Sequence, residues 1–148
     1  MAKYKLELHA HTKDISKCAS VSVEQLTELY TAAGYTGVVL TNHFEPYTFS
    51  FFNGTTWEEK VREYISGYEK LCDAAAGKLD IILGAEVRMT DYFNDYLLFG
   101  VTKEFLFKNP GIFEYGIKRL SAVCRDNGIM VYQAHPFRNG MTVVNPSY

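Results

Sequence analysis

Polar and apolar residues alternate at the start of the chain. In residues 3–9, KYKLELH, apolar side chains stand at every second position. Because successive side chains of a strand point to opposite faces, this period of two predicts a half-buried β-strand.

A helix and a second strand are predicted next. Ser22 and Gln25 fit a capping box, and Gly34 fits the C-terminal cap of the helix that follows. The apolar face of this helix is expected to hold Leu26, Leu29, Tyr30 and Ala33. The short apolar run at 37–43, GVVLTNH, predicts a strand buried on both faces, as in parallel sheets.

The same order then recurs. Thr56 and Glu59 fit a second capping box, an apolar stripe continues to Gly77, and residues 80–86, DIILGAE, form an apolar run. The stripe consists of Val61, Ile65, Tyr68, Cys72 and Ala75. These features predict a second helix and a third strand.

Two further strands and a helix are predicted in the last third of the chain. The strands are residues 95–101, DYLLFGV, and residues 128–135, GIMVYQAH. Asn109 and Pro110 fit the start of a helix that ends at Asn127. Its apolar positions are Phe113, Ile117, Leu120 and Cys124.

Strands that alternate with helices predict an α/β fold with a mainly parallel sheet, in one domain over residues 1–148. Hydrophobic residues make up 47% of the chain, which is enough for a large core. The net charge is -2 and no Lys/Arg cluster suits nucleic acid, so we do not expect that partner. No stretch of about 20 apolar residues and no signal peptide is visible, so we expect a cytoplasmic protein. The three cysteines form no CxxC pair, which argues against a disulfide framework.

Four histidines and one glutamate lie at the C-terminal ends of predicted strands: His9, His11, His43, His135 and Glu86. A histidine at such a position can also cap a loop or bond to a buried carbonyl group, which explains any one of them but not all four. Ligands of α/β folds bind at the carboxyl ends of parallel strands, so we expect these side chains to converge. Imidazoles and a carboxylate suit zinc, manganese or iron, and a carboxylate can bridge two ions.

Four short motifs resemble those of the PHP (polymerase and histidinol phosphatase) family: HAHT at 9–12, TNH at 41–43, GAE at 84–86 and AHPFR at 134–138. The resemblance implies a distorted (β/α)7 barrel, of which about five strands are present here. It also implies up to three divalent metal ions and hydrolysis of phosphate esters. Carried over, His9 and His11 bind one ion, Glu86 bridges two, His43 serves a second ion and His135 a third.

The chain departs from the family pattern in several places. Position 42 is Asn rather than Asp, which still allows a hydrogen bond to a ligand but removes a charge. After HAHT the family has an Asp or His, and here Cys18 is a better-placed candidate ligand than Asp14, although a plain loop cysteine explains it equally well. A histidine expected near the fourth strand is missing, and we do not expect Asp95 to replace it.

The chain stops at Tyr148, before the DxH pair that completes the family's metal cluster. We expect either a fragment of a longer gene product or a short relative whose barrel is open. An open sheet edge can pair with another strand, so we expect a homodimer that covers it. Alternatively, residues 141–148 fold back over the open side of the barrel.

The expected activity is hydrolysis of a small phosphomonoester by a metal-activated water, with no side-chain nucleophile. Arg88 and Arg138 lie close to the same rim and are candidates to bind the phosphate, although a solvated loop arginine explains either one alone. The aromatic segment 45–57 follows His43 and is either a lid or specificity loop over the site or an extension packed against the barrel. The alternative is a non-catalytic PHP-like module that binds metal or a protein partner. What separates the two hypotheses is whether the missing DxH pair exists in the full gene product.

Overall fold

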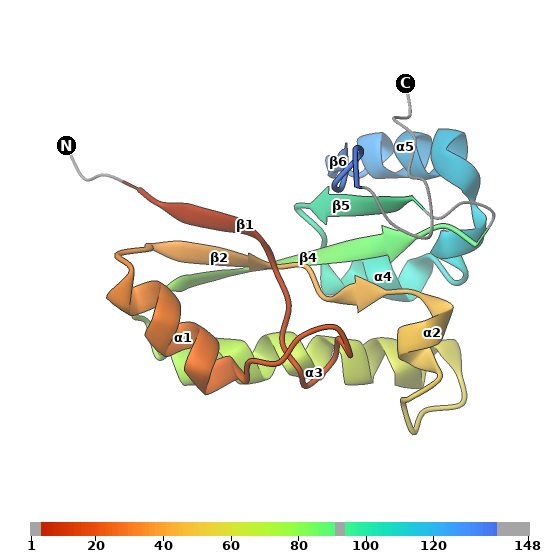
Figure 1. The fold of residues 1–148 in the computed structure, drawn as a ribbon. Coiled ribbons are helices and arrows are strands. Elements are labelled where there is room, and N and C mark those ends of the chain that lie inside the picture. The colour runs from red at the N-terminus through yellow and green to blue at the C-terminus, as the bar shows by residue number, and fades with distance from the viewer. Residues whose placement is uncertain (1–3, 91–93, 139–148) are drawn as a thin grey trace.

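The computed structural model describes residues 4–90 and 94–138, which form a mixed α/β structure around one curled sheet (Figure 1). The strands are β1 (Leu6–Ala10), β2 (Gly37–Leu40), β3 (His43–Phe44), β4 (Asp80–Arg88), β5 (Asp95–Phe99) and β6 (Met130–Gln133). The α-helices are α1 (Val23–Ala32), α2 (Pro46–Phe49), α3 (Trp57–Ala75), α4 (Lys103–Lys108) and α5 (Gly116–Asp126). A 3₁₀ turn, η1, covers Ile112–Glu114.

The sheet has the strand order β1-β2-β4-β5-β6 and curls like half of a barrel (Figure 1). β1, β2 and β4 are parallel, and β3 pairs in parallel with the second half of β4. β5 is antiparallel to both of its neighbours, so the expectation of a mainly parallel sheet is wrong for this strand. Only residues 89–94 join β4 to β5, and a parallel crossover needs about a dozen residues or more.

Both predicted capping boxes are present. Ser22 and Gln25 bond reciprocally at the start of α1, and Thr56 and Glu59 do so at the start of α3. The prediction that Leu29 is buried is wrong, because 60% of its surface is exposed.

The structure corrects several predicted boundaries. The single strand expected at 37–43 is divided into β2 and β3. The helix expected from Asn109 begins only at α5, because Gly111 and Gly116 adopt positive φ angles of 66° and 68° on either side of η1. The short helices α2 and α4 were not predicted.

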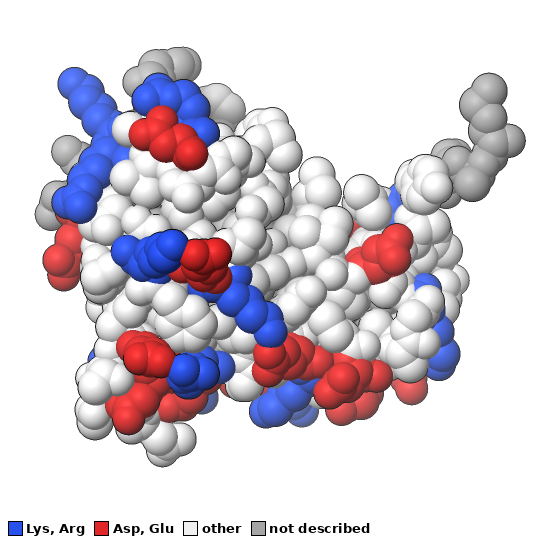
Figure 2. Space-filling model, turned by 180° about the vertical axis from the view of Figure 1, so that it is seen from behind, with Lys and Arg blue, Asp and Glu red and all other residues white. Residues whose placement is uncertain are grey.

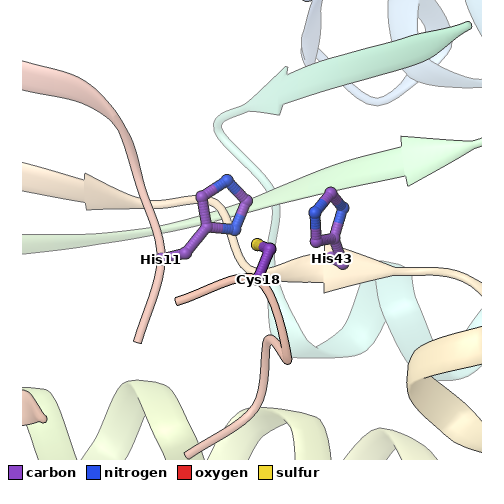
Figure 3. A group of neighbouring side chains, drawn as sticks. All are labelled: His11, Cys18 and His43. Carbon is purple, nitrogen blue, oxygen red and sulfur yellow. The ribbon is translucent and has the colours of Figure 1, made fainter. Parts of the chain in front are cut away.

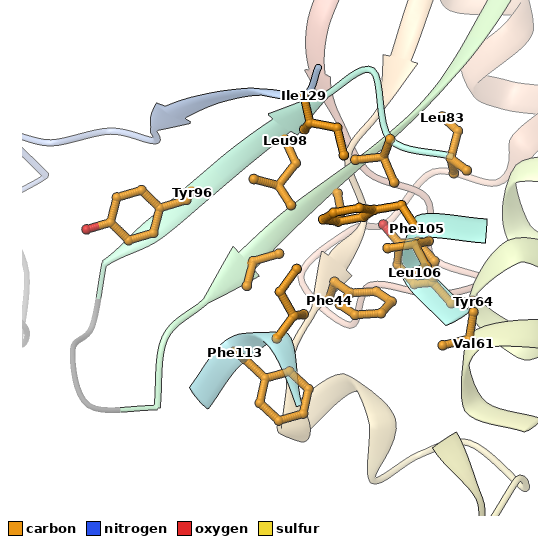
Figure 4. Close-up of a cluster of buried hydrophobic side chains, with 14 of the residues drawn as sticks. Phe44, Val61, Tyr64, Leu83, Tyr96, Leu98, Phe105, Leu106, Phe113 and Ile129 are labelled. Carbon is orange, nitrogen blue, oxygen red and sulfur yellow. The ribbon is translucent and has the colours of Figure 1, made fainter. Parts of the chain in front are cut away.

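Helices α1 and α3 cover one face of β1 and β2. Their shared core includes Leu26, Val38, Leu40 and Leu71. A larger core lies between α3, β4, β5 and the segments that follow, with Phe44, Tyr64, Leu98 and Phe105 among its buried side chains (Figure 4).

The opposite, concave face of the sheet is apolar. A cavity of about 580 Å³ lies on it, lined mainly by alternate residues of the five long strands. The exposed large side chains in this lining are Leu6, Leu8, Ile82, Met130 and Tyr132. We refer to these five residues as the concave apolar patch.

Charged side chains of both signs are interspersed on the face shown in Figure 2, and no broad area of one sign covers it. Among the described residues, no helix is long and apolar enough to cross a bilayer.

Candidate metal centre

A β-bulge in β1 determines the direction of the His9 and His11 side chains. The pairing of β1 with β2 shifts register between Glu7 and Ala10, so two residues of β1 stand opposite Val39 alone. Ala10 therefore faces the helices together with Leu40, although Leu8, two residues earlier, lines the concave face. Such a bulge re-aims neighbouring side chains, and it brings those of residues 9 and 11 to the cavity described below.

The other candidate ligands come from separate elements. His43 begins β3 and lies beside Glu86 of β4, its partner in the ladder. His135 follows β6. The sequence predicted Glu86 at the end of a strand, and this is wrong because β4 continues to Arg88. The Glu86 side chain is only 1% exposed.

The structure brings all five expected histidine and glutamate ligands together. They line one cavity of about 320 Å³ that also includes Cys18 and Arg138. The predicted convergence of these side chains is therefore a feature of the structure.

Three of these side chains form a triangle. His9 Nε2 and His11 Nε2 are 2.9 Å apart, and they lie 3.2 Å and 3.1 Å from Glu86 Oε2. Atoms that bind one tetrahedral ion at about 2.0–2.1 Å are separated by about 3.3 Å, so the triangle has the size of a metal-binding face. These atoms could hold one metal ion.

Glu86 extends the cluster in two directions. His43 Nδ1 lies 3.2 Å from Glu86 Oε2, whereas His135 Nε2 lies 3.1 Å from Glu86 Oε1. Both carboxylate oxygens thus face imidazoles, as a bridging ligand requires. His135 Nδ1 is buried without a hydrogen-bond partner among the described residues, and an unpaired buried nitrogen is costly unless an ion or another group binds it.

Asp95, which we did not expect to act as a ligand, lies beside the cluster. A ligand atom of Asp95, one of His43 and one of Glu86 all lie within 4.8 Å of one another. Asp95 is buried, and its Oδ2 lies 3.7 Å from His135 Nε2. The antiparallel pairing of β5 with β4 places it there, and the sequence motif gave no sign of that pairing.

Cys18 lies near the histidines, at an exposed position of the loop that follows β1. Its Sγ and a ring nitrogen each of His11 and His43 lie within 4.8 Å of one another, and Figure 3 shows the three side chains facing one another. Burial raises the pKa of the Cys18 thiol, so the free thiol is mostly protonated at neutral pH. Asp14, the other candidate, is exposed and belongs to none of the three possible ligand groups among the described residues.

The charges of the cluster favour an ionised carboxylate. Burial of Glu86 opposes its ionisation, but the neighbouring imidazoles of His11 and His9 outweigh it and hold the pKa of Glu86 well below the usual range. The hydrogen bond to Glu86 raises the pKa of His9, whereas burial lowers the pKa of His43. The site therefore contains a fixed negative charge faced by imidazoles, an arrangement that a cation stabilises.

The two candidate phosphate ligands differ in their surroundings. Arg88 donates two hydrogen bonds to Asp95, of 2.7 and 2.9 Å, and its Nε lies 3.7 Å from Glu45. Part of its guanidinium is therefore already hydrogen-bonded to Asp95. Arg138 is exposed and lines the cavity of the cluster. Both arginines also line an adjoining cavity of about 240 Å³, beside Lys17 and Glu45.

Fold and cluster define a mixed α/β protein with a candidate divalent-metal site on the concave side of its sheet. A scan against protein-family models and a search of curated proteins find no match to this chain.

Proposed function

We propose that the protein hydrolyses small phosphomonoesters in a metal-dependent reaction in which water is the nucleophile. The observation that carries this proposal is the set of four imidazoles around the two oxygens of buried Glu86. A divalent ion held there supplies a Lewis acid that activates water and neutralises phosphate oxygens. Zinc, manganese and iron all suit these ligands, and the number of ions, up to three, is part of the proposal.

The resemblance to the PHP family supports the same activity. We propose that the half-barrel corresponds to the N-terminal portion of a PHP-type (β/α)7 barrel. The motifs lie at β1, β3, β4 and the segment after β6, and their histidines and glutamate line one cavity.

The protein's own side chains bind and orient the substrate. Arg138 faces the cavity from the chain end of the described residues and offers a guanidinium fork to phosphate oxygens. Arg88 offers the part of its guanidinium that Asp95 leaves open. His135 and Asp95 lie between Glu86 and Arg88, where they define the edge of the site.

The test is hydrolysis of p-nitrophenyl phosphate by purified protein with added Mn²⁺ or Zn²⁺. We expect turnover that chelation abolishes and that falls to background in His9→Ala and in Glu86→Gln. Asp80→Asn is the matched control, because Asp80 is an exposed carboxylate at the other end of β4. Its activity should equal that of the wild type.

The alternative of a non-catalytic module gives a different result. A wild-type protein that binds stoichiometric metal but hydrolyses neither p-nitrophenyl phosphate nor its diester would contradict the proposed activity and favour the module.

A further inference from the structure

A buried serine lies beneath the candidate metal centre. Ser16 belongs to the loop between β1 and α1 and has no exposed surface. The adjacent Ile15 presses so closely against α3 that a Cβ on Gly67 would lie 2.4 Å from Ile15 Cγ1. The loop is therefore held in place on a helix that belongs to the core.

The orientation of the Asn42 amide is fixed by the backbone. The N–H of Thr12 donates to Asn42 Oδ1 over 2.8 Å, and the Asn42 amide nitrogen donates to Thr12 Oγ1 over 3.3 Å. Since a backbone N–H can only donate, the atom that faces it must be the amide oxygen.

This oxygen determines where the hydroxyl hydrogen of Ser16 points. Ser16 Oγ lies 3.0 Å from Asn42 Oδ1, which can only accept, so Ser16 donates to it. The backbone N–H of His43 donates to Ser16 Oγ over 2.9 Å and uses one of its lone pairs. Ser16 has no second hydrogen to give.

His11 is the remaining partner of Ser16. Its Nδ1 lies 3.3 Å from Ser16 Oγ, and it must donate because the hydroxyl hydrogen is already used. A neutral imidazole carries one N–H, so a proton on Nδ1 leaves a lone pair on Nε2. That lone pair faces His9 Nε2 and Glu86 Oε2.

We propose that Ser16, oriented by Asn42, is a positioning residue that holds His11 in its Nδ1–H tautomer and so presents the Nε2 lone pair to the metal. The role in metal binding rests on the proposed function, whereas the tautomer itself does not. Partners of this kind fix the ring orientation of metal-binding histidines. The same hydroxyl also ties the backbone of His43 to the loop that follows His11, so one side chain places two ligands.

The assignment also gives position 42 a role. Asn42 acts through its acceptor oxygen, which a carboxylate would offer as well. Replacement of this residue by Asp should therefore preserve the tautomer, whereas removal of the Ser16 hydroxyl should not.

The test measures the tautomer and the metal affinity separately. ¹⁵N NMR of the metal-free protein at alkaline pH should show His11 protonated on Nδ1 in the wild type and in Asn42→Asp. In Ser16→Ala it should show a mixture of tautomers. Metal affinity, measured by titration calorimetry with Zn²⁺, should fall about 10- to 100-fold in Ser16→Ala. Ser20→Ala, an exposed serine of the same loop, is the matched control and should match the wild type in both measurements.

The outcomes separate the two proposals. An Nε2–H tautomer in the metal-free wild type overturns the inference, and because it needs no variant it decides the matter even where Ser16→Ala does not fold. An unchanged tautomer and affinity in folded Ser16→Ala also overturn it. A wild type with the Nδ1–H tautomer that binds no Zn²⁺ supports the tautomer assignment and contradicts the proposed function instead.

Discussion

The residue at the centre of the candidate site is Glu86. It is almost fully buried, it lies beside all four histidines of the chain, and the imidazoles of His11 and His9 keep its pKa low despite that burial. A carboxylate in such surroundings needs compensating positive charge. The imidazoles supply only part of it while they are neutral, and a bound cation would supply the rest.

A second buried carboxylate has a partner of its own. Asp95 is paired with Arg88 through two hydrogen bonds across the β4–β5 ladder. We predict that Arg88→Ala lowers the free energy of unfolding of the metal-free protein, because it leaves a buried charge unpaired. The loss should be smaller than the roughly 3–5 kcal/mol of fully buried pairs, because the Arg88 side chain is 37% exposed.

Urea denaturation measures this loss. Arg62→Ala is the control, since Arg62 pairs with Glu58 on the exposed surface of α3, where removal should cost no more than about 0.5 kcal/mol. Equal losses in the free energy of unfolding for Arg88→Ala and Arg62→Ala would contradict the prediction.

At the scale of elements, the start of α3 depends on Glu59. Its carboxylate accepts hydrogen bonds from the backbone N–H groups of Thr55 and Thr56, which lower its pKa from 4.5 to about 2. A folded-state pKa below the unfolded one gives stability that is present above pH 4.5 and is lost as the pH falls toward 2.

We therefore predict that the free energy of unfolding falls less between pH 5 and pH 2 in Glu59→Gln than in the wild type. The amide oxygen of Gln can still accept the hydrogen bonds but does not titrate. Urea denaturation across this pH range, with Glu58→Gln on the same turn as the control, measures the difference. Parallel pH profiles for Glu59→Gln and the wild type would contradict the account of this helix start.

The sequence predicts those elements that local interactions determine. The capping boxes of α1 and α3 are local, and so is the apolar run that becomes β4. The division of 37–43 into β2 and β3 and the antiparallel place of β5 depend on strand pairing between distant residues. No short-range pattern reports such pairing.

In the candidate site too, the sequence predicted what local spacing determines and missed what contacts between distant residues determine. The spacing of His9 and His11 suggested a shared direction, and the structure supplies a β1 bulge that no periodicity shows. Ser16 was not singled out, because its role depends on Asn42, which lies 26 residues away. Asp95 was set aside because its closeness to the cluster depends on the pairing of β5 with β4.

At the scale of the whole molecule, the concave apolar patch is the main exposed apolar feature of the described sheet. β1 and β6 form the two edges of the sheet and run in the same direction, since β5 between β4 and β6 is antiparallel to both. A twofold axis parallel to the strands would place two copies with their concave faces together. The β1 edge of each copy would then pair with the β6 edge of the other. This arrangement would cover the patch and both edges.

We predict that the protein forms a dimer through this face. Sedimentation velocity at micromolar concentration should show a dimer for the wild type and a monomer for a Leu8→Glu, Tyr132→Glu double variant. Leu29→Glu, at an exposed leucine of α1, is the control and should remain dimeric. A monomeric wild type would contradict the prediction.

Anomalous diffraction from crystals grown with Zn²⁺ or Mn²⁺ would show whether the histidine–glutamate cluster binds a divalent metal ion. We expect an anomalous peak at about 2.0–2.2 Å from His9 Nε2, His11 Nε2 and a Glu86 oxygen. Crystals with no peak at this cluster at saturating metal, and with the two imidazoles still in contact with Glu86, would contradict this expectation.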